Sequence, residues 1–212
     1  MEEAKQPART QSASNTPVPE WANPTPAGLV ALAVACFCFF ALLNGFVETS
    51  ALPLIGCWLI GGFVIQVIVA LLDLKNKNFV GGNTFLFFSG FFMLAGGLEM
   101  FVKYHGVLTG VPVDARIDGW AWLALAIVVL LWTPAFMKPF SLLSLIVLTL
   151  NVALPFIVVL DLGILPMTWA PVPAYALLVA GCLGIYLSAA MIVNGALGKT
   201  FYPVIGPRTP KK

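Results

Sequence analysis

Charge is what this sequence has least of: Asp, Glu, Lys and Arg make up 9% of its 212 residues. Soluble domains carry roughly 25% charged residues, so the charges present are too few to coat a globule of this size. They are also clustered, which leaves several apolar stretches of about 18 or more residues with at most one charge each. This pattern excludes a soluble fold, a disordered chain and a disulfide scaffold.

The sequence also lacks the patterns of several functional classes. A net charge of +2 supplies no basic face, so no nucleic-acid partner is expected. There is one histidine, and GxSxG, HExxH and P-loop motifs do not occur. We therefore expect no enzyme, no cofactor and no primary pump, which leaves passive transport, ion-coupled transport or a structural role.

The four cysteines predict no metal site. Cys36, Cys38, Cys57 and Cys182 all lie inside apolar runs, where thiols behave as small hydrophobes. Cys36 and Cys38 are two residues apart, so on a helix their side chains point about 200° away from each other. They therefore cannot chelate one metal ion together.

Apolar residues are abundant, at 60% of the sequence. They form six stretches long enough to cross a hydrocarbon core of ~30 Å at ~1.5 Å per residue. The sequence predicts an all-α integral membrane protein, with a disordered tail over 1–22, a transmembrane domain over 23–198 and a C-terminal tail over 199–212. The six transmembrane helices are expected at about 29–47, 52–72, 84–102, 120–137, 140–160 and 173–197.

The basic residues predict the orientation. Nine of the eleven Lys and Arg fall on the side of the two tails and of the loops after the second and fourth spans. The positive-inside rule then places both termini in the cytoplasm, which requires an even number of spans, as found. We expect a multi-pass protein of the plasma membrane.

Polar residues inside the spans are candidates for function, because burying them in a membrane is costly. Gln66 can both donate and accept hydrogen bonds, and both pore lining and interhelical bonding remain open for it. The same holds for Asn151, whose carbonyl loses its helical donor to Pro155. Glu99 lies about three residues before the predicted end of its span, which favours snorkelling to the outer interface over proton coupling.

The third predicted span is rich in phenylalanine. Phe88 and Phe92 are four residues apart and share one helix face, as do Phe87 and Phe91. One of these faces could form a hydrophobic constriction that gates by dewetting. The single histidine, His105, falls in the following loop, where a solvated residue is favoured over an acid sensor.

A proline-rich segment precedes the first span. It reads Asn23-Pro24-Thr25-Pro26-Ala27-Gly28-Leu29. Its prolines force extended backbone on the residues before them, and Asn23 can cap a helix. The first helix would begin with free N–H groups and its positive dipole end at the cytoplasmic mouth, which favours a small anion there.

This segment resembles the N-P-A-P-L-G-L signature of the acetate uptake transporter family, the succinate–acetate permeases. The end of the chain is similar to that family's closing pattern, through Tyr186-Leu187, Asn194, Gly198-Lys199-Thr200, Pro203 and Ile205-Gly206. The middle is similar as well, through Gly61, Gly62, Gln66, Leu71-Leu72-Asp73 and Gly82-Asn83-Thr84-Phe85. The resemblance covers roughly residues 23–206.

The sequence departs from the family pattern at the expected constriction. Leu32 stands where the first helix should supply an aromatic residue. The tyrosine expected in the third helix is missing, and Phe92 or Met93 would occupy its place. The constriction is then expected to be hydrophobic and without a hydroxyl group.

The resemblance implies a six-helix protomer, assembled as a homo-hexamer with one pore in each subunit. It implies acetate and related short carboxylates as substrates, with succinate as a further candidate, moved as anions or with a proton. Glu99 is the candidate for a proton-linked role. The residues expected along the substrate pathway are Asn23, Pro24, Pro26, Gly28, Leu29, Leu32, Gln66, Asn83, Thr84, Phe92, Met93, Asn151, Tyr186 and Asn194.

Two other functions compete with this reading. A six-helix urea or amide channel would suit an uncharged aromatic pore equally well. A membrane scaffold would use the same polar residues only to hold its helices together, and it would move no solute. The terminal motifs favour the carboxylate transporter over the urea or amide channel, whereas the scaffold predicts no loss of function when Gln66 is changed to leucine.

Overall fold

The computed structural model describes residues 21–206. Most of the tail predicted over 1–22, and residues 207–212 of the tail predicted over 199–212, therefore lie outside the described residues. The described part is helical and contains no strand. Its elements are α1 (Thr25–Leu43), η1 (Thr49–Ala51), α2 (Leu52–Lys75), α3 (Phe79–Phe87), η2 (Phe88–Ala95), α4 (Gly96–Thr109), α5 (Arg116–Phe136), α6 (Leu142–Asp161), η3 (Met167–Trp169) and α7 (Pro171–Leu197).

Six helical stretches are long and apolar enough to cross a membrane, which confirms the predicted number of spans. α3, η2 and α4 together form one of them, because the chain stays helical from 79 to 109. η2 is a π-helical segment within it. The stretch runs past Lys103 and ends where Gly110 adopts a left-handed conformation, with φ of 68°.

Local sequence explains several helix boundaries. Proline occupies the first turn of α1, α2 and α7, where its missing N–H costs no helical hydrogen bond. The side chain of Asn78 caps α3 by accepting a hydrogen bond from the Gly81 amide at 3.1 Å. Ser141 and Ser144 form a reciprocal capping box at the start of α6.

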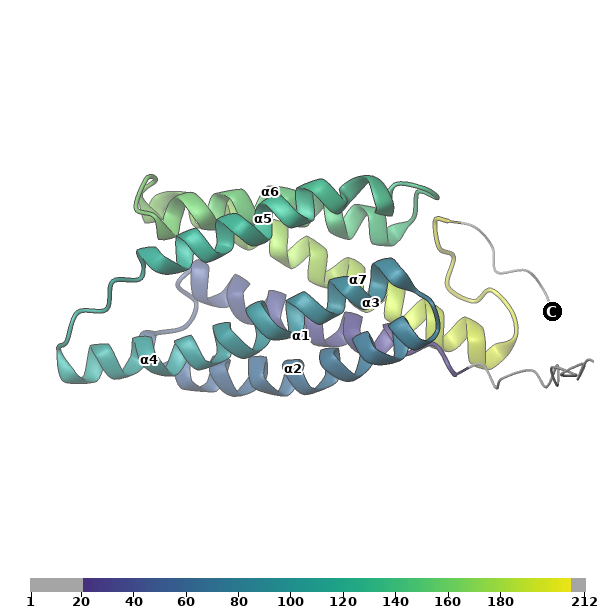
Figure 1. The fold of residues 1–212 in the computed structure, drawn as a ribbon, viewed down its shortest axis with the longest axis horizontal. Coiled ribbons are helices and arrows are strands. Elements are labelled where there is room, and N and C mark those ends of the chain that lie inside the picture. The colour runs from purple at the N-terminus through teal and green to yellow at the C-terminus, as the bar shows by residue number, and fades with distance from the viewer. Residues whose placement is uncertain (1–20, 207–212) are drawn as a thin grey trace, which may run out of the picture.

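The helices form two layers with α7 between them (Figure 1). α5 and α6 pack together as a hairpin in one layer, and α1, α2 and the α3–η2–α4 helix form the other. α7 packs against both α1 and α6. α1 also approaches α3 closely, since a Cβ atom on Gly28 would lie 2.6 Å from the Phe85 ring.

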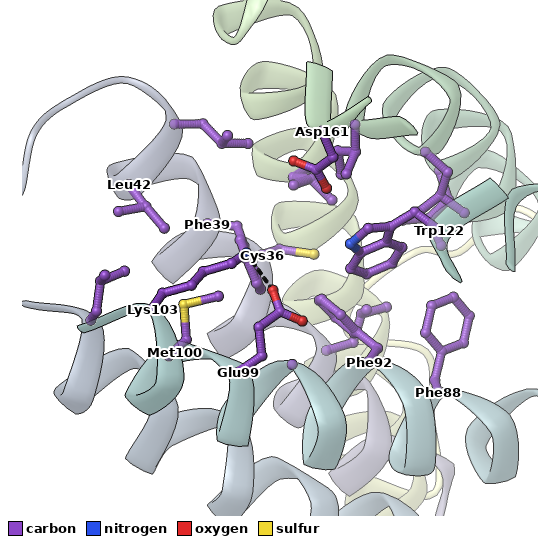
Figure 2. Close-up of a pocket in the computed structure, with 18 residues that line it drawn as sticks. Cys36, Phe39, Leu42, Phe88, Phe92, Glu99, Met100, Lys103, Trp122 and Asp161 are labelled. Carbon is purple, nitrogen blue, oxygen red and sulfur yellow. Dashed lines mark hydrogen bonds and ion pairs between the residues drawn. The ribbon is translucent and has the colours of Figure 1, made fainter. Parts of the chain in front are cut away.

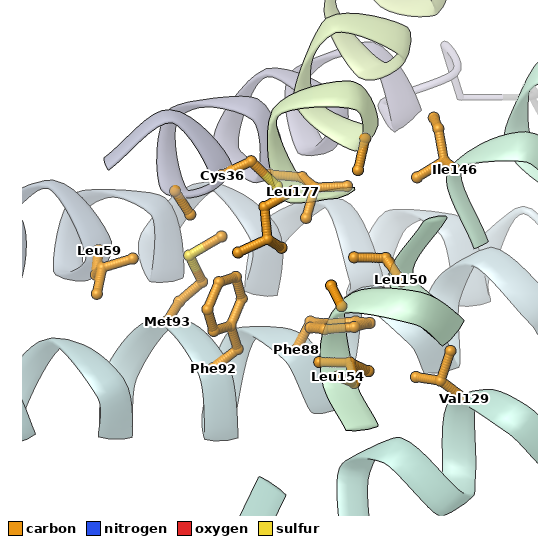
Figure 3. Packing of buried hydrophobic residues seen from close by; sticks show 14 of the residues in the cluster. Cys36, Leu59, Phe88, Phe92, Met93, Val129, Ile146, Leu150, Leu154 and Leu177 are labelled. Carbon is orange, nitrogen blue, oxygen red and sulfur yellow. The ribbon is translucent and has the colours of Figure 1, made fainter. Parts of the chain in front are cut away.

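The buried apolar core lies between the two layers. Phe88 and Phe92 from η2 meet Leu150 and Leu154 from α6 there, beside Leu177 from α7 (Figure 3). Two cavities interrupt this core. They define the candidate site.

Candidate functional site

The first cavity, the acidic cavity, has a volume of about 120 Å³. Its wall is mainly apolar and aromatic, with Phe39, Phe92 and Trp122 among its residues, and its polar groups are Glu99, Lys103 and Asp161. Figure 2 shows these polar groups around the cavity, from α4 and α6. Leu42 and Leu43, at the C-terminal end of α1, also line it.

The second cavity, the glutamine cavity, has a volume of about 350 Å³. It lies toward the opposite end of α1, because Thr25 and Leu29 line it. Gln66 from α2 and Thr84 from α3 also face it, and Lys138, between α5 and α6, is the cation in its wall. The two cavities thus enter the helix bundle from opposite ends.

Three residues line both cavities and therefore separate them: Leu32, Phe88 and Leu150. All three are buried, with at most 7% of each side chain exposed. We call them the apolar constriction. The Phe88 ring is fixed by stacking on Phe87 at 4.5 Å and by an edge contact with Phe92 at 5.9 Å.

The structure places the residues expected at the constriction in three different positions. Leu32 lies in the apolar constriction, which contains no hydroxyl group. The third-helix position belongs to Phe88, whereas Phe92 lines the acidic cavity alone. Met93 lines neither cavity, because its side chain is fully buried with its sulfur beside Gly62.

The expectation for Phe92 or Met93 rests on comparison with the family motif, and the third helix changes its geometry within this stretch. η2 begins at Phe88, and a π-helix turns through fewer degrees per residue than an α-helix. Phe92, four residues after Phe88, still lines the acidic cavity, whereas Met93 is buried away from both cavities. Leu150, which completes the constriction, carries no sequence signal that distinguishes it from the other leucines of α6.

Gln66 is the most deeply buried polar group of the glutamine cavity, with 1% of its surface exposed. Its amide nitrogen donates to the Gly28 carbonyl at 3.4 Å. Its side-chain oxygen has no hydrogen-bond partner among residues 21–206. Because an unsatisfied buried acceptor is costly, this oxygen is suited to a hydrogen-bond donor that enters the cavity.

The proline-rich segment anchors the start of α1. The Asn23 side chain accepts from the amide of Thr25, the first residue of α1, at 3.0 Å, and the Pro26 carbonyl accepts from Ser188 of α7 at 2.9 Å. The Thr25 hydroxyl donates to Asp73 of α2 at 3.4 Å. Neither Asn23, Pro24, Pro26 nor Gly28 is in the cavity walls, so the segment positions Thr25 and Leu29, which are.

Four other residues expected along the pathway lie outside both cavities. Asn83 donates to the Phe79 carbonyl of its own helix at 2.8 Å. Asn151 joins α6 to α5 through the Thr133 hydroxyl at 2.6 Å. Tyr186 and Asn194 bind the segment after α7, through the carbonyls of Pro203 and Tyr202 at 2.7 and 2.8 Å.

Glu99 occupies a different setting from the one predicted. The sequence places it near the end of a span, but the helix continues ten residues further, to Thr109. Glu99 lines the acidic cavity and accepts from Lys103 at 2.5 Å. Lys103 and Asp161, which share this cavity, were not among the predicted site residues, because hydropathy alone places them at or beyond the span ends.

The described residues include no cluster of potential metal ligands. Across residues 21–206, no group of three or more His, Cys, Asp or Glu side chains is placed to hold a metal ion. The site thus consists of two cavities that are separated by the three side chains of the apolar constriction. It defines a multi-pass membrane protein with a solute pathway inside a single chain.

Comparison with known proteins identifies the fold. The chain has the fold of the bacterial acetate channel SatP, with a TM-score of 0.70 and 19% sequence identity over 87% of this chain and 99% of the channel. It is also 28% identical over 94 residues to ammonia transport outward protein 2 of Saccharomyces cerevisiae. That match spans 43% of this chain and about a third, 32%, of the yeast protein. No family model matches. Both matches support the resemblance to acetate uptake transporters.

Proposed function

We propose that this protein conducts acetate and related short carboxylates across the membrane, through the glutamine cavity, the apolar constriction and the acidic cavity. The observation that carries the proposal is the pair of cavities that enter one helix bundle from opposite ends and share Leu32, Phe88 and Leu150. A scaffold needs no such path. The fold shared with an acetate channel supports the same conclusion.

Gln66 is the residue proposed to receive the solute. A protonated carboxylic acid has one O–H donor and one carbonyl acceptor, and a primary amide offers the complementary pair. The free oxygen of Gln66 would accept the acid proton while its amide nitrogen donates back. A bare carboxylate has no donor for this oxygen, so the neutral acid suits the deepest part of the path better than the anion.

Lys138 would gather the anion before it reaches Gln66. It lies in the wall of the glutamine cavity, and an ammonium group in a partly apolar cavity attracts negative charge. Past it, the constriction offers the solute only apolar side chains. An anion pays a large desolvation cost in such surroundings, which favours transfer together with a proton.

The assembly and orientation complete the proposal. We propose a homo-hexamer in the plasma membrane, with both termini in the cytoplasm and one path in each subunit. The face of α5 away from α6 supports an apolar neighbour, since Trp120, Leu130 and Leu131 are each more than 60% exposed. Either lipid or a second subunit would remove these apolar side chains from water.

Uptake of labelled acetate into proteoliposomes, with and without an inward proton gradient, tests the proposal. We expect uptake above protein-free vesicles and competition by excess unlabelled acetate. Leu150→Trp, which fills the constriction, should abolish uptake. Its matched control is Leu148→Trp, because Leu148 lies on the same helix and is 40% exposed. Folded protein that admits no acetate would refute the proposal.

A second candidate is a small neutral solute such as ammonia or urea. The yeast relative is named as an ammonia transport protein, and the free oxygen of Gln66 would accept an N–H group as readily as an acid O–H. Labelled urea and ammonia-driven pH change, measured in the same vesicles, distinguish the candidates. Entry of urea or ammonia without entry of acetate would favour a channel for neutral solutes over the carboxylate channel.

A further inference from the structure

Four charged side chains meet at the entrance of the acidic cavity. Glu99 and Lys103 come from α4, Asp118 from the first turn of α5 and Asp161 from the last turn of α6. Three of them line the cavity, and Asp118 binds Lys103 from outside its wall. We call these four residues the entrance cluster. It is separate from Gln66 and from the apolar constriction.

The Lys103 ammonium group already forms ion pairs within this cluster. The Lys103 ammonium lies 2.5 Å from Glu99 and 2.9 Å from Asp118. Two carboxylates from two helices therefore hold the one ammonium group, and its charge is neutralised where it stands. Lys103 is thus a poor receptor for an entering anion, although it lines the cavity.

Asp161 is the unpaired member. It lies on the α6 side of the cavity, across from Glu99 (Figure 2). No hydrogen bond or ion pair joins it to another group in the part of the chain that the structure describes. With all four groups ionised, three carboxylates face one ammonium, and the entrance has a net negative charge.

A negative entrance acts on permeants by their charge. A neutral acid is not repelled, and the repulsion energy of a dianion is twice that of a monoanion. One unit of charge about 6 Å away in water changes a local concentration roughly threefold. The apolar wall around the cluster strengthens this effect, because low-dielectric walls focus the field.

We propose that the entrance cluster selects the permeant by its valence: it admits short monocarboxylates and their neutral acids and discriminates against dicarboxylate dianions. Asp161 supplies one unit of the excess negative charge, and Glu99 with Asp118 exceeds the Lys103 charge by another unit. The inference rests on the proposed function and narrows its substrate class.

The test compares uptake of labelled acetate and labelled succinate at pH 7.5 in proteoliposomes, for the unmodified protein and for Asp161→Asn. Removing the Asp161 charge breaks no contact that the structure shows. We expect the succinate-to-acetate ratio to rise at least about threefold. Raising the salt concentration should reduce the discrimination of the unmodified protein, since salt screens an exposed field.

Asp114→Asn is the matched control. Asp114 lies in the loop before α5, is paired with Arg116 at 2.6 Å and lines neither cavity. Its removal changes the net charge equally but should leave the ratio unchanged. Acetate uptake with equal ratios in the unmodified protein and Asp161→Asn overturns the inference alone. Absence of acetate uptake from the unmodified protein overturns the proposed function and this inference with it.

Discussion

At the scale of single residues, the cavity walls rather than burial distinguish two polar groups inside the helix bundle. Gln66 and Asn151 each have a buried side-chain oxygen without a partner among residues 21–206. Gln66 lines a cavity, however, whereas Asn151 lies between α5 and α6. The sequence leaves both roles open for both residues, and the cavity walls supply the distinction.

Gln66→Leu should reduce acetate uptake strongly. Leucine fills a similar volume but can neither donate nor accept, so the solute loses hydrogen bonds worth about 1–3 kcal/mol, or roughly 5- to 150-fold in flux. The measurement is initial uptake in proteoliposomes with equal amounts of inserted protein. Asn83→Ala is the control, because Asn83 bonds only within its own helix and lines no cavity. Unchanged uptake by Gln66→Leu would remove Gln66 from the pathway.

At the scale of elements, the segment after α7 is tied back onto its own helix. The Asn194 side chain donates to the Tyr202 carbonyl at 2.8 Å and accepts from the amides of Phe201 and Tyr202 at 2.8 and 2.9 Å. Tyr186 adds a bond to Pro203 at 2.7 Å. These motif residues thus stabilise the closing segment, which brings Gly206 against Ser141 at the start of α6.

Asn194→Ala should loosen this segment and leave the path open. Three hydrogen bonds are lost, each worth about 1 kcal/mol, so hydrogen exchange at the amides of Phe201 and Tyr202 should accelerate at least tenfold. Acetate uptake should stay within about twofold of the unmodified protein, because Asn194 lines neither cavity. A large loss of uptake with the segment still protected from exchange would restore the pathway role predicted from the motif.

The helices themselves were largely predictable, because an apolar stretch of this length satisfies its backbone hydrogen bonds inside a membrane by forming a helix. The third was predicted too short, since hydropathy falls at Lys103 while helical hydrogen bonding continues to Gly110. The π-helical segment that begins at Phe88 was not predictable from periodicity. Nor was the entrance cluster, since Glu99, Asp118 and Asp161 meet only through the packing of three helices.

At the scale of the whole molecule, the charges at the two ends of the bundle differ. The acidic cavity opens at the end that has Glu99, Asp118 and Asp161, and the glutamine cavity at the end that has Lys138. The distribution of Lys and Arg predicts that the second end faces the cytoplasm. A membrane-impermeant probe can test this orientation directly.

Asp114→Cys, introduced into a variant without the four native cysteines, should react with an impermeant maleimide added to intact cells. Lys77→Cys, in the turn between α2 and α3, should react only after the membrane is permeabilised. Both side chains are exposed, so the membrane decides the difference. Mass shift after labelling measures the reaction. The reverse pattern would contradict the proposed orientation.

Both cavities and the constriction are built from one chain, and this has a genetic consequence. In the proposed hexamer each subunit would have its own path, so a blocked copy would not impair the working copies beside it. Cells that express a functional and a non-functional allele together would lose activity in proportion to the share of blocked copies. Such alleles would reduce activity additively and would not act as dominant negatives, even if the subunits assemble into one complex.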